Sequence, residues 1–346
     1  MKSSTIAGLV LGIAILTMAI PGFAQTHAPW PSDWNNWFDP NLWVTVGNPG
    51  NAPDTRYDAN GFGAVSYTYK MGKFEVTAGQ YTGFLNAVGK TDTYGLYDTS
   101  MWSSSYGCEI QQSGSPGSYT YSVDPNWANR AVNCVSWGDA ARFCNWLTHC
   151  QPSGAQDANT TEDGSYYLNG VTTNDLLAVT RRTAAEGGRY YIPTEDEWYK
   201  AAYHKNDGAT GNYSDYPTGS DSIPSNEVLT TDGGNNANFW ALTWIGGPYY
   251  RTLAGDFENS ESPYGTFDQG GNVAEWNEAI LESSCRAVRG GSFSNGYNLL
   301  SGGGREGYGP MLTSVDVGFR VVEIPEPATL SLLALAGLAV LRRRRK

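Results

Sequence analysis

Residues 262–276 read Ser-Pro-Tyr-Gly-Thr-Phe-Asp-Gln-Gly-Gly-Asn-Val-Ala-Glu-Trp and place acidic side chains, Asp268 and Glu275, on either side of two glycines. The two carboxylates can converge only if the backbone between them doubles back, which Gly270 and Gly271 permit because glycine tolerates positive φ. A loop of that shape points carboxylates and carbonyls at one centre, and calcium is bound by that mixture. An ordinary tight turn with solvated acids is the alternative that these residues leave open.

The chain around this stretch has a globular but unusual composition. Its 346 residues suffice for one large or two ordinary domains. Only 16% of the residues are charged, while 12 Trp and 22 Tyr indicate a loop-rich, aromatic-rich protein. The formal charge is −12, and six of the positive charges lie at the two ends, so the part between them is more acidic still. An acidic surface disfavours nucleic acid and anionic membranes as partners.

The N-terminus has the features of a secretion signal. Lys2 is followed by an apolar run over residues 6–20, and Gly22-Phe23-Ala24 suits cleavage after Ala24. We therefore expect residues 1–24 to be a signal peptide and the mature protein to be exported.

The C-terminus, residues 324–346, reads as a second targeting signal. Pro325-Glu326-Pro327 precedes an apolar stretch over 328–341 and a basic cluster over 342–346. The apolar stretch is short for a stable span, and the basic cluster would stay cytoplasmic. This tail resembles the PEP-CTERM sorting signal of Gram-negative bacteria. The resemblance implies recognition by an exosortase, transient anchoring in the inner membrane, and delivery to the envelope, cell surface or extracellular matrix. A plain membrane anchor is the alternative.

The exported part contains five cysteines and three histidines. Two disulfides and one free thiol are possible in an oxidising compartment, but the spacing does not fix the pairing. No Cys-x-x-Cys pair occurs, and the histidines are not spaced as ligands on one helix, so a histidine-based metal centre is disfavoured. These residues are Cys108, Cys134, Cys144, Cys150, Cys285, His27, His149 and His204.

Residues 25–60 form a Trp-rich lead-in to a main domain over 61–323. We expect the lead-in to be irregular, with Trp30, Trp34, Trp37 and Trp43 packed onto the domain; an exposed carbohydrate-stacking platform is the alternative. Strands are expected over 64–76, 286–289, 290–293 and 317–322. Long polar inserts cover 91–130, 151–188 and 205–236.

Three helices share one start signal, a hydroxyl N-cap three residues before a side chain that can reach back to it. The pairs are Thr77 with Gln80, Ser136 with Asp139, and Thr194 with Glu197. Capping and the helix dipole are sufficient to explain the acids of the third helix, residues 195–197. Strands at both ends with helices between them predict an α+β domain in which the first and last strands are neighbours.

Seven blocks in this chain carry a family resemblance. They are residues 73–77, 132–137, 143–147, 192–198, 270–276, 289–293 and 318–320. In this order they resemble the sulfatase-modifying factor, or formylglycine-generating enzyme, family over Val65 to Val322. The resemblance implies a C-type-lectin-like fold with little regular secondary structure.

The resemblance also gives residues 262–276 a role. In calcium-containing members the corresponding loop supplies two side chains and two backbone carbonyls. By position these are the side chains of Asp268 and Glu275 and the carbonyls of Gly271 and Val273. We therefore expect a structural calcium ion at this loop.

Other metal sites of the family lack their residues here. A second calcium site would need Asn238, the Phe239 carbonyl and an acidic turn, and residues 241–250 do not show that turn in register. Enzymatic members hold copper with two cysteines, three and eight residues after the serine of Arg-Gly-Gly-Ser; here these positions are Asn295 and Leu300. Without thiolates a copper site is disfavoured. The histidine-rich iron site of other relatives also has no counterpart.

Two functions are consistent with these observations. The first is a non-catalytic, calcium-stabilised surface module whose long loops bind a polysaccharide or an envelope protein, with Tyr94, Tyr97, Trp102 and Tyr106 as candidate contacts. The second is an exported oxidoreductase or modifying enzyme of the formylglycine-generating class with a rearranged metal site. The missing cysteines favour the first, because function is argued from sites. No residue is assigned a catalytic role.

Overall fold

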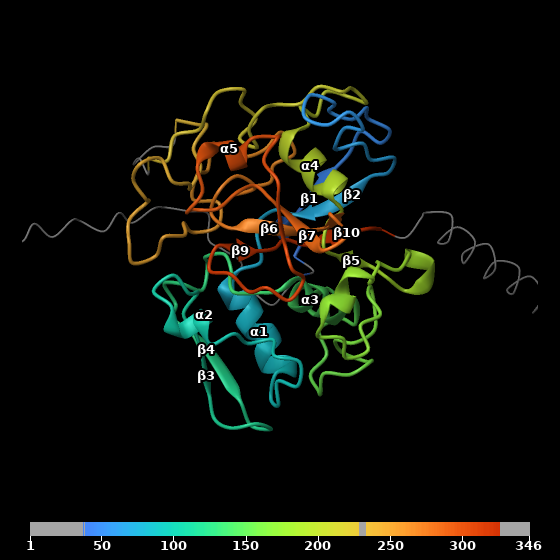
Figure 1. The fold of residues 1–346 in the computed structure, drawn as a ribbon, viewed down its shortest axis with the longest axis vertical. Helices are drawn as coiled ribbons and strands as arrows, with labels where there is room; N and C mark the ends of the chain where they lie inside the picture. Colours follow the sequence, from blue (N-terminus) through green and yellow to red (C-terminus); the bar gives the residue numbers. More distant parts are fainter. Residues whose placement is uncertain (1–36, 38, 228–232, 326–346) are drawn as a thin grey trace, which may run out of the picture.

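The computed structural model describes residues 37, 39–227 and 233–325. The predicted signal peptide, its cleavage site, Trp30, Trp34 and most of the sorting tail lie outside the described residues. No helix in the described part of the chain is long and apolar enough to cross a bilayer. Short helices and strands are linked by long loops that cover much of the surface (Figure 1).

A four-stranded antiparallel sheet joins the two ends of the domain. Its order is β1 (Trp43–Val46), β2 (Tyr69–Gly72), β10 (Val322–Glu323), β5 (Tyr190–Tyr191). Val322 of β10 lies opposite Met71 of β2, which confirms that the first and last strands of the domain are neighbours. β1 comes from the lead-in, which is thus part of the sheet and not wholly irregular. Trp37 packs as predicted, buried against Phe143 with ring centroids 5.5 Å apart.

A second sheet lies at the centre of the molecule (Figure 1). Its order is β8 (Glu306–Tyr308), β7 (Cys285–Arg289), β6 (Ala274–Leu281), β9 (Val317–Gly318). β9 runs parallel to β6, and the other pairs are antiparallel. A separate hairpin, β3 (Ile110–Ser113) with β4 (Thr120–Val123), forms within the insert 91–130.

The three predicted helices begin where their capping boxes place them. α1 (Ala78–Val88), α3 (Trp137–Thr148) and α4 (Glu195–Tyr203) each have both hydrogen bonds of the box. α1 ends at Gly89 as expected. The shorter helices are α2 (Ser100–Ser103), α5 (Tyr297–Leu300) and the 3₁₀ turns η1 (Pro40–Leu42), η2 (Asn174–Leu177) and η3 (Ala184–Glu186).

Aromatic rings fill the core between α1, α3 and the sheet ends. Phe84 and Phe143 meet edge to face at 5.2 Å, and Phe143 meets Phe319 at 5.3 Å. All three rings are fully buried. Edge-to-face pairs stabilise such a core beyond the area they bury.

Three strand predictions need correction. Of residues 64–76 only Tyr69–Gly72 form a strand. Residues 290–293 form none, because Gly290 and Gly291 adopt φ of +90° and +65°, outside the β region. The stretch 317–322 is divided because β9 pairs with β6 while β10 pairs with β2, so the chain crosses from one sheet to the other.

Candidate functional site

Residues 262–273 reverse direction and lead directly into β6. Asp268 and Gly271 take left-handed φ of +61° and +82°. A Cβ at Gly271 would lie 2.1 Å from a backbone oxygen, so glycine is required there. Gly270 does not adopt positive φ, contrary to prediction. It is needed for space instead, since a Cβ would lie 2.5 Å from Pro217.

Glu275 forms a fully buried ion pair with Arg320. The guanidinium Nε donates to Oε2 and Nη2 donates to Oε1, each at 2.6 Å. Trp198 Nε1 donates to Oε2 at 2.7 Å. Neither charged side chain has any exposed area. Such a pair is maintained at low dielectric only because its geometry is bidentate and its polar atoms are satisfied.

Arg320 also fixes backbone on either side of this pair. Its Nη1 donates to the Gly72 carbonyl at 3.1 Å, and its Nη2 donates to the Phe267 carbonyl at 2.8 Å. One side chain therefore connects the end of β2, the loop before β6, and β6 itself.

Two more carboxyl groups lie in the same region. Asp268 Oδ2 accepts a hydrogen bond from the Gly255 amide at 2.7 Å, and burial raises the pKa of Asp268 to about 7. Glu75 accepts hydrogen bonds from the Val273 amide at 3.2 Å and from Asn272 Nδ2 at 2.5 Å. Burial, followed by the nearby carboxylates, raises the pKa of Glu75 well above its ordinary value.

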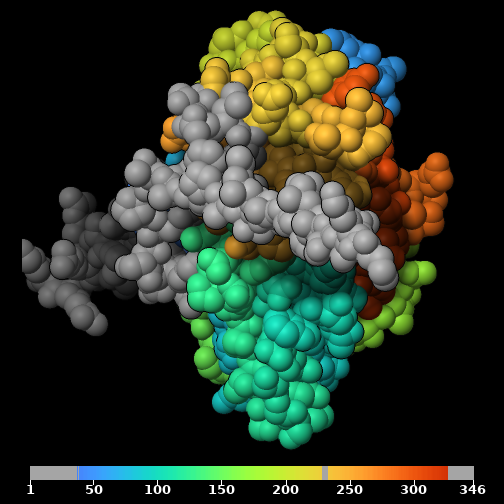
Figure 2. Space-filling model, turned by 90° about the vertical axis from the view of Figure 1, so that its left-hand side faces the viewer, coloured from blue at the N-terminus to red at the C-terminus, as the bar shows by residue number. Residues whose placement is uncertain are grey.

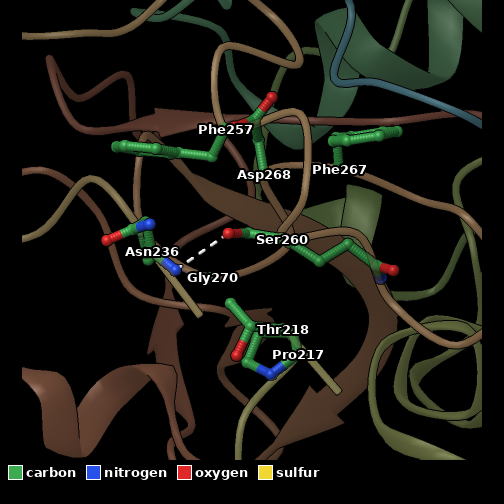
Figure 3. Close-up of a pocket in the computed structure, with 10 residues that line it drawn as sticks. Pro217, Thr218, Asn236, Phe257, Ser260, Phe267, Asp268 and Gly270 are labelled. Carbon is green, nitrogen blue, oxygen red and sulfur yellow. Dashed lines mark hydrogen bonds between the residues drawn. The ribbon is translucent and has the colours of Figure 1, made fainter. Parts of the chain in front are cut away.

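Asp268 borders a small pocket beside the loop that precedes β6 (Figure 3). Phe257 and Phe267 lie on either side of Asp268 in this view. Thr218 and Pro217 lie below in this view, and Asn236 lies to the left, where its backbone amide donates to Ser260 Oγ at 2.9 Å. Burial of the Asp268 carboxyl group is the largest cause of its raised pKa.

The acidic residues in the first turn of α4 do more than cap the helix. Glu197 caps Thr194 as predicted, and it also accepts from Arg181 Nη2 at 2.7 Å. Glu195 accepts from Arg289 Nε at 2.6 Å and from Arg305 Nη2 at 2.5 Å. Capping alone was therefore an incomplete explanation of these acids.

Two of the four aromatic residues predicted as ligand contacts have structural roles. The Arg142 guanidinium lies 4.7 Å from the centre of the Tyr94 ring, and Tyr97 packs on Tyr121 at 5.6 Å. Trp102 is exposed, at 46% of its surface, on α2. Tyr106 belongs to a larger aromatic group.

The aromatic patch consists of four rings in contact, those of Tyr106, Trp244, Tyr250 and Phe293, together with Trp240 on the same loop as Trp244. Tyr250 contacts three of its members, with ring centroids 4.8 Å from Tyr106 and 6.0 Å from both Phe293 and Trp244. Trp240 and Trp244 are 43% and 49% exposed. Figure 2 shows the face where the yellow and orange loops that carry residues 240–250 reach the surface. The sequence analysis identified only Tyr106 of this patch, although two tryptophans within five residues of a loop were a usable signal.

The patch lies against the loop that follows β7. The Trp240 amide donates to the Asn295 carbonyl at 2.8 Å. Asn295 Oδ1 in turn accepts from the Ser292 amide at 2.8 Å and from Ser292 Oγ at 2.7 Å. Leu300, at the end of α5, is fully buried in a cluster with Tyr216, Ala237 and Phe239.

Comparison with known families identifies this arrangement. The family model described as the sulfatase-modifying factor enzyme 1-like domain matches residues 45–324. The chain belongs to this family. A second model, the PEP-CTERM protein-sorting motif, matches residues 323–346, so the protein is exported and sorted to the envelope. A search of curated proteins finds no match.

Solved structures of similar shape include CarF, which is 19% identical with a TM-score of 0.52 over 82% of this chain and 98% of that one. Treponema denticola variable protein 1 is 18% identical, with a TM-score of 0.46 over 82% and 95% of the two chains. PvdO from Pseudomonas aeruginosa is 17% identical, with a TM-score of 0.43 over 82% and 91%. The match to CarF supports the α+β, C-type-lectin-like fold.

The copper positions of this sulfatase-modifying-factor domain are occupied by residues that serve the fold. Asn295 holds Ser292 through two hydrogen bonds, and Leu300 fills an apolar cluster. The neighbouring Arg305 is engaged by Glu195. Leu300 is fully buried, while Asn295 and Arg305 are partly exposed.

The four predicted calcium ligands, Asp268, Gly271, Val273 and Glu275, fit the ion poorly in this arrangement. Arg320 already balances the charge of Glu275, and an ion beside that carboxylate would face the guanidinium. Calcium here stays a prediction, which requires Glu275 to be shared between the ion and Arg320.

Proposed function

We propose that this chain is a cell-surface protein whose sulfatase-modifying-factor domain binds a ligand and does not oxidise cysteine. The observation that carries the proposal is the pair Asn295 and Leu300. Family resemblance places the copper-binding thiolates of enzymatic members at these positions, and here both side chains have structural partners. A site without thiolates lacks the soft ligands that Cu(I) selects.

The ligand is a neutral polysaccharide of the envelope or extracellular matrix, and the aromatic patch is its contact surface. Trp240 and Trp244 expose flat apolar faces, which stack on the apolar faces of sugar rings. Tyr106 and Tyr250 add polar hydroxyl groups beside them. The chain has a net charge of −12, which disfavours an anionic polymer.

The sorting tail brings the protein to such a ligand. The match over residues 323–346 implies recognition by exosortase machinery, in which Pro325-Glu326-Pro327 is the motif. The apolar stretch 328–341 would hold the protein transiently in the inner membrane until the tail is cleaved. Release then places the domain at the cell surface or in the matrix.

Calcium is not needed for this proposal. The Arg320 guanidinium already links the segments that the predicted ion would link. The alternative function is a modifying enzyme with a rearranged metal site. In the part that the structure describes, no cluster of three metal-ligating side chains supports it.

Affinity electrophoresis through gels that contain neutral matrix polysaccharide tests the proposed ligand. The mature protein should be retarded, and Trp240→Ala/Trp244→Ala should bind at least about tenfold more weakly, because stacking contributes about 1 kcal/mol per ring. Tyr167→Ala is the control, since Tyr167 is 56% exposed outside the patch. Equal retardation of all three proteins, or binding to lipid vesicles or envelope proteins alone, would contradict the proposal.

A further inference from the structure

Two buried cysteines from separate segments lie near each other in this fold. Cys108 precedes β3 and Cys134 precedes α3, and they are 0% and 1% exposed. Cys108 Sγ lies 3.9 Å from the carbonyl oxygen of Asn133, and that carbonyl belongs to the peptide bond that leads into Cys134. The Cys108 sulfur therefore lies beside the peptide group that joins Asn133 to Cys134.

Hydrogen bonds fix the two backbones against each other at this point. Asn133 Nδ2 donates to the Tyr106 carbonyl at 2.7 Å. Arg251 Nη1 and Nη2 donate to the carbonyls of Tyr106 and Gly107, each at 2.7 Å. The Cys134 amide donates to the Ser314 carbonyl at 2.8 Å. The segments therefore meet in one fixed arrangement.

The remaining cysteines occupy other parts of the fold. Cys144 is buried on α3, Cys150 is exposed just after α3, and Cys285 is partly exposed on β7. Neither of the last two has the buried position shared by Cys108 and Cys134. The sequence left all pairings open, and the fold places the Cys108 sulfur beside the backbone that leads into Cys134.

We infer that Cys108 and Cys134 form a disulfide bond in the exported protein. The sorting tail takes the chain out of the reducing cytoplasm, where a thiol pair would persist. Each thiol loses its proton, the pair gives two electrons to an envelope disulfide oxidant, and one S–S bond forms. The oxidant's disulfide is reduced to a dithiol through a mixed-disulfide intermediate.

Burial requires that this bond form early. Burial raises the pKa of both thiols, because a thiolate in the apolar interior is disfavoured. A folded, reduced molecule thus holds two unreactive thiols, and oxidation takes place before the surrounding segments close. The bond closes a loop that contains the β3–β4 hairpin, and it braces the backbone beside Tyr106 of the aromatic patch. The inference depends on export and not on the proposed ligand.

Peptide mapping of the full chain, exported into a periplasm and purified without reductant, tests the pairing. The protein is denatured in the presence of an alkylating agent, which blocks free thiols. It is then digested and analysed by mass spectrometry before and after reduction. We expect a cross-linked peptide pair that joins Cys108 to Cys134 and separates on reduction. Quantitative alkylation of both cysteines, or their pairing with Cys144, Cys150 or Cys285, would overturn the inference.

Thermal unfolding gives an independent readout if a variant fails to accumulate. The unaltered protein and Cys285→Ser, unfolded and refolded with reductant, should melt about 5 to 10 °C lower than their oxidised forms. Cys134→Ala should melt at the same temperature with and without reductant. No effect of reductant on the unaltered protein would overturn the inference, even if Cys134→Ala cannot be purified.

Discussion

At the scale of single residues, the stability of the folded protein depends on one buried guanidinium. Arg320 pairs with Glu275 through two hydrogen bonds of 2.6 Å, and Trp198 completes the shell of the carboxylate. The sequence identified all three residues within family blocks. It gave no sign that they meet, because 45 residues separate Glu275 from Arg320 and long-range ion pairs leave no periodic pattern.

Removing the charge of Glu275 should be costly. Glu275→Gln leaves Arg320 as a buried cation without a counterion, and we expect a loss of about 3 to 5 kcal/mol in the free energy of unfolding. Denaturant titration measures this loss. Glu261→Gln is the control, because Glu261 is exposed in the same region and should change stability by less than about 0.5 kcal/mol. Equal effects of the two substitutions would contradict this role of the ion pair.

Asp268 should make stability depend on pH. Its folded pKa of about 7 lies above the ordinary value of 3.8, so the folded state binds a proton more tightly than the unfolded state. Stability is therefore lost as the pH rises from about 4 to 7, and the loss is constant above that.

Asp268→Asn removes this titration while keeping a carbonyl oxygen for the Gly255 amide. Relative to the unaltered protein it should be more stable by about 1 to 2 kcal/mol at pH 8, with little difference at pH 4. Denaturation midpoints across this pH range provide the measurement. A difference that does not change with pH would show that Asp268 is not the titrating group.

At the scale of elements, local signals predicted helices better than strands. The capping boxes at Thr77, Ser136 and Thr194 fixed three helix starts, because both hydrogen bonds of a box form within four residues. β6 was missed because the buried strand includes the polar Glu275 and Asn277, which hides any alternation of polar and apolar residues. The aromatic patch was only partly predicted, since its members come from three distant segments.

A capping box should be worth about 1 kcal/mol. Thr194→Ala removes the acceptor for the Glu197 amide, and we expect the free energy of unfolding to fall by about that amount. Thr99→Ala is a matched control, because Thr99 is the N-cap of α2 but makes no side-chain cap hydrogen bond. Equal losses for the two variants would show that the box contributes no more than the threonine side chain alone.

At the scale of the whole molecule, the internal cation Arg320 connects both sheets, and its partner Glu275 also accepts a hydrogen bond from Trp198 of α4. Arg320 lies between β9 and β10 and contacts the end of β2, the loop before β6, and Glu275 of β6. A calcium ion at Asp268 and Glu275 would duplicate this connection. The sequence resemblance predicted the ion from its ligand positions, and it did not show that Glu275 also pairs with Arg320.

Chelation should therefore have little effect on the folded protein. We expect the melting temperature to change by less than about 1 °C when EDTA is added and calcium is restored, since Arg320 supplies the positive charge. Differential scanning calorimetry measures this change. A fall of several degrees on chelation, reversed by calcium, would show that the ion shares Glu275 with Arg320.

The central claim is that this sulfatase-modifying-factor domain has kept the fold without the cysteine-oxidising site. The most direct measurement is mass spectrometry of a cysteine-containing sulfatase peptide incubated with the exported protein, copper and oxygen. With Asn295 and Leu300 in place of the copper-binding thiolates, the cysteine should not be converted to formylglycine, and no aldehyde should be trapped. Conversion of the cysteine to an aldehyde by this protein would contradict the account.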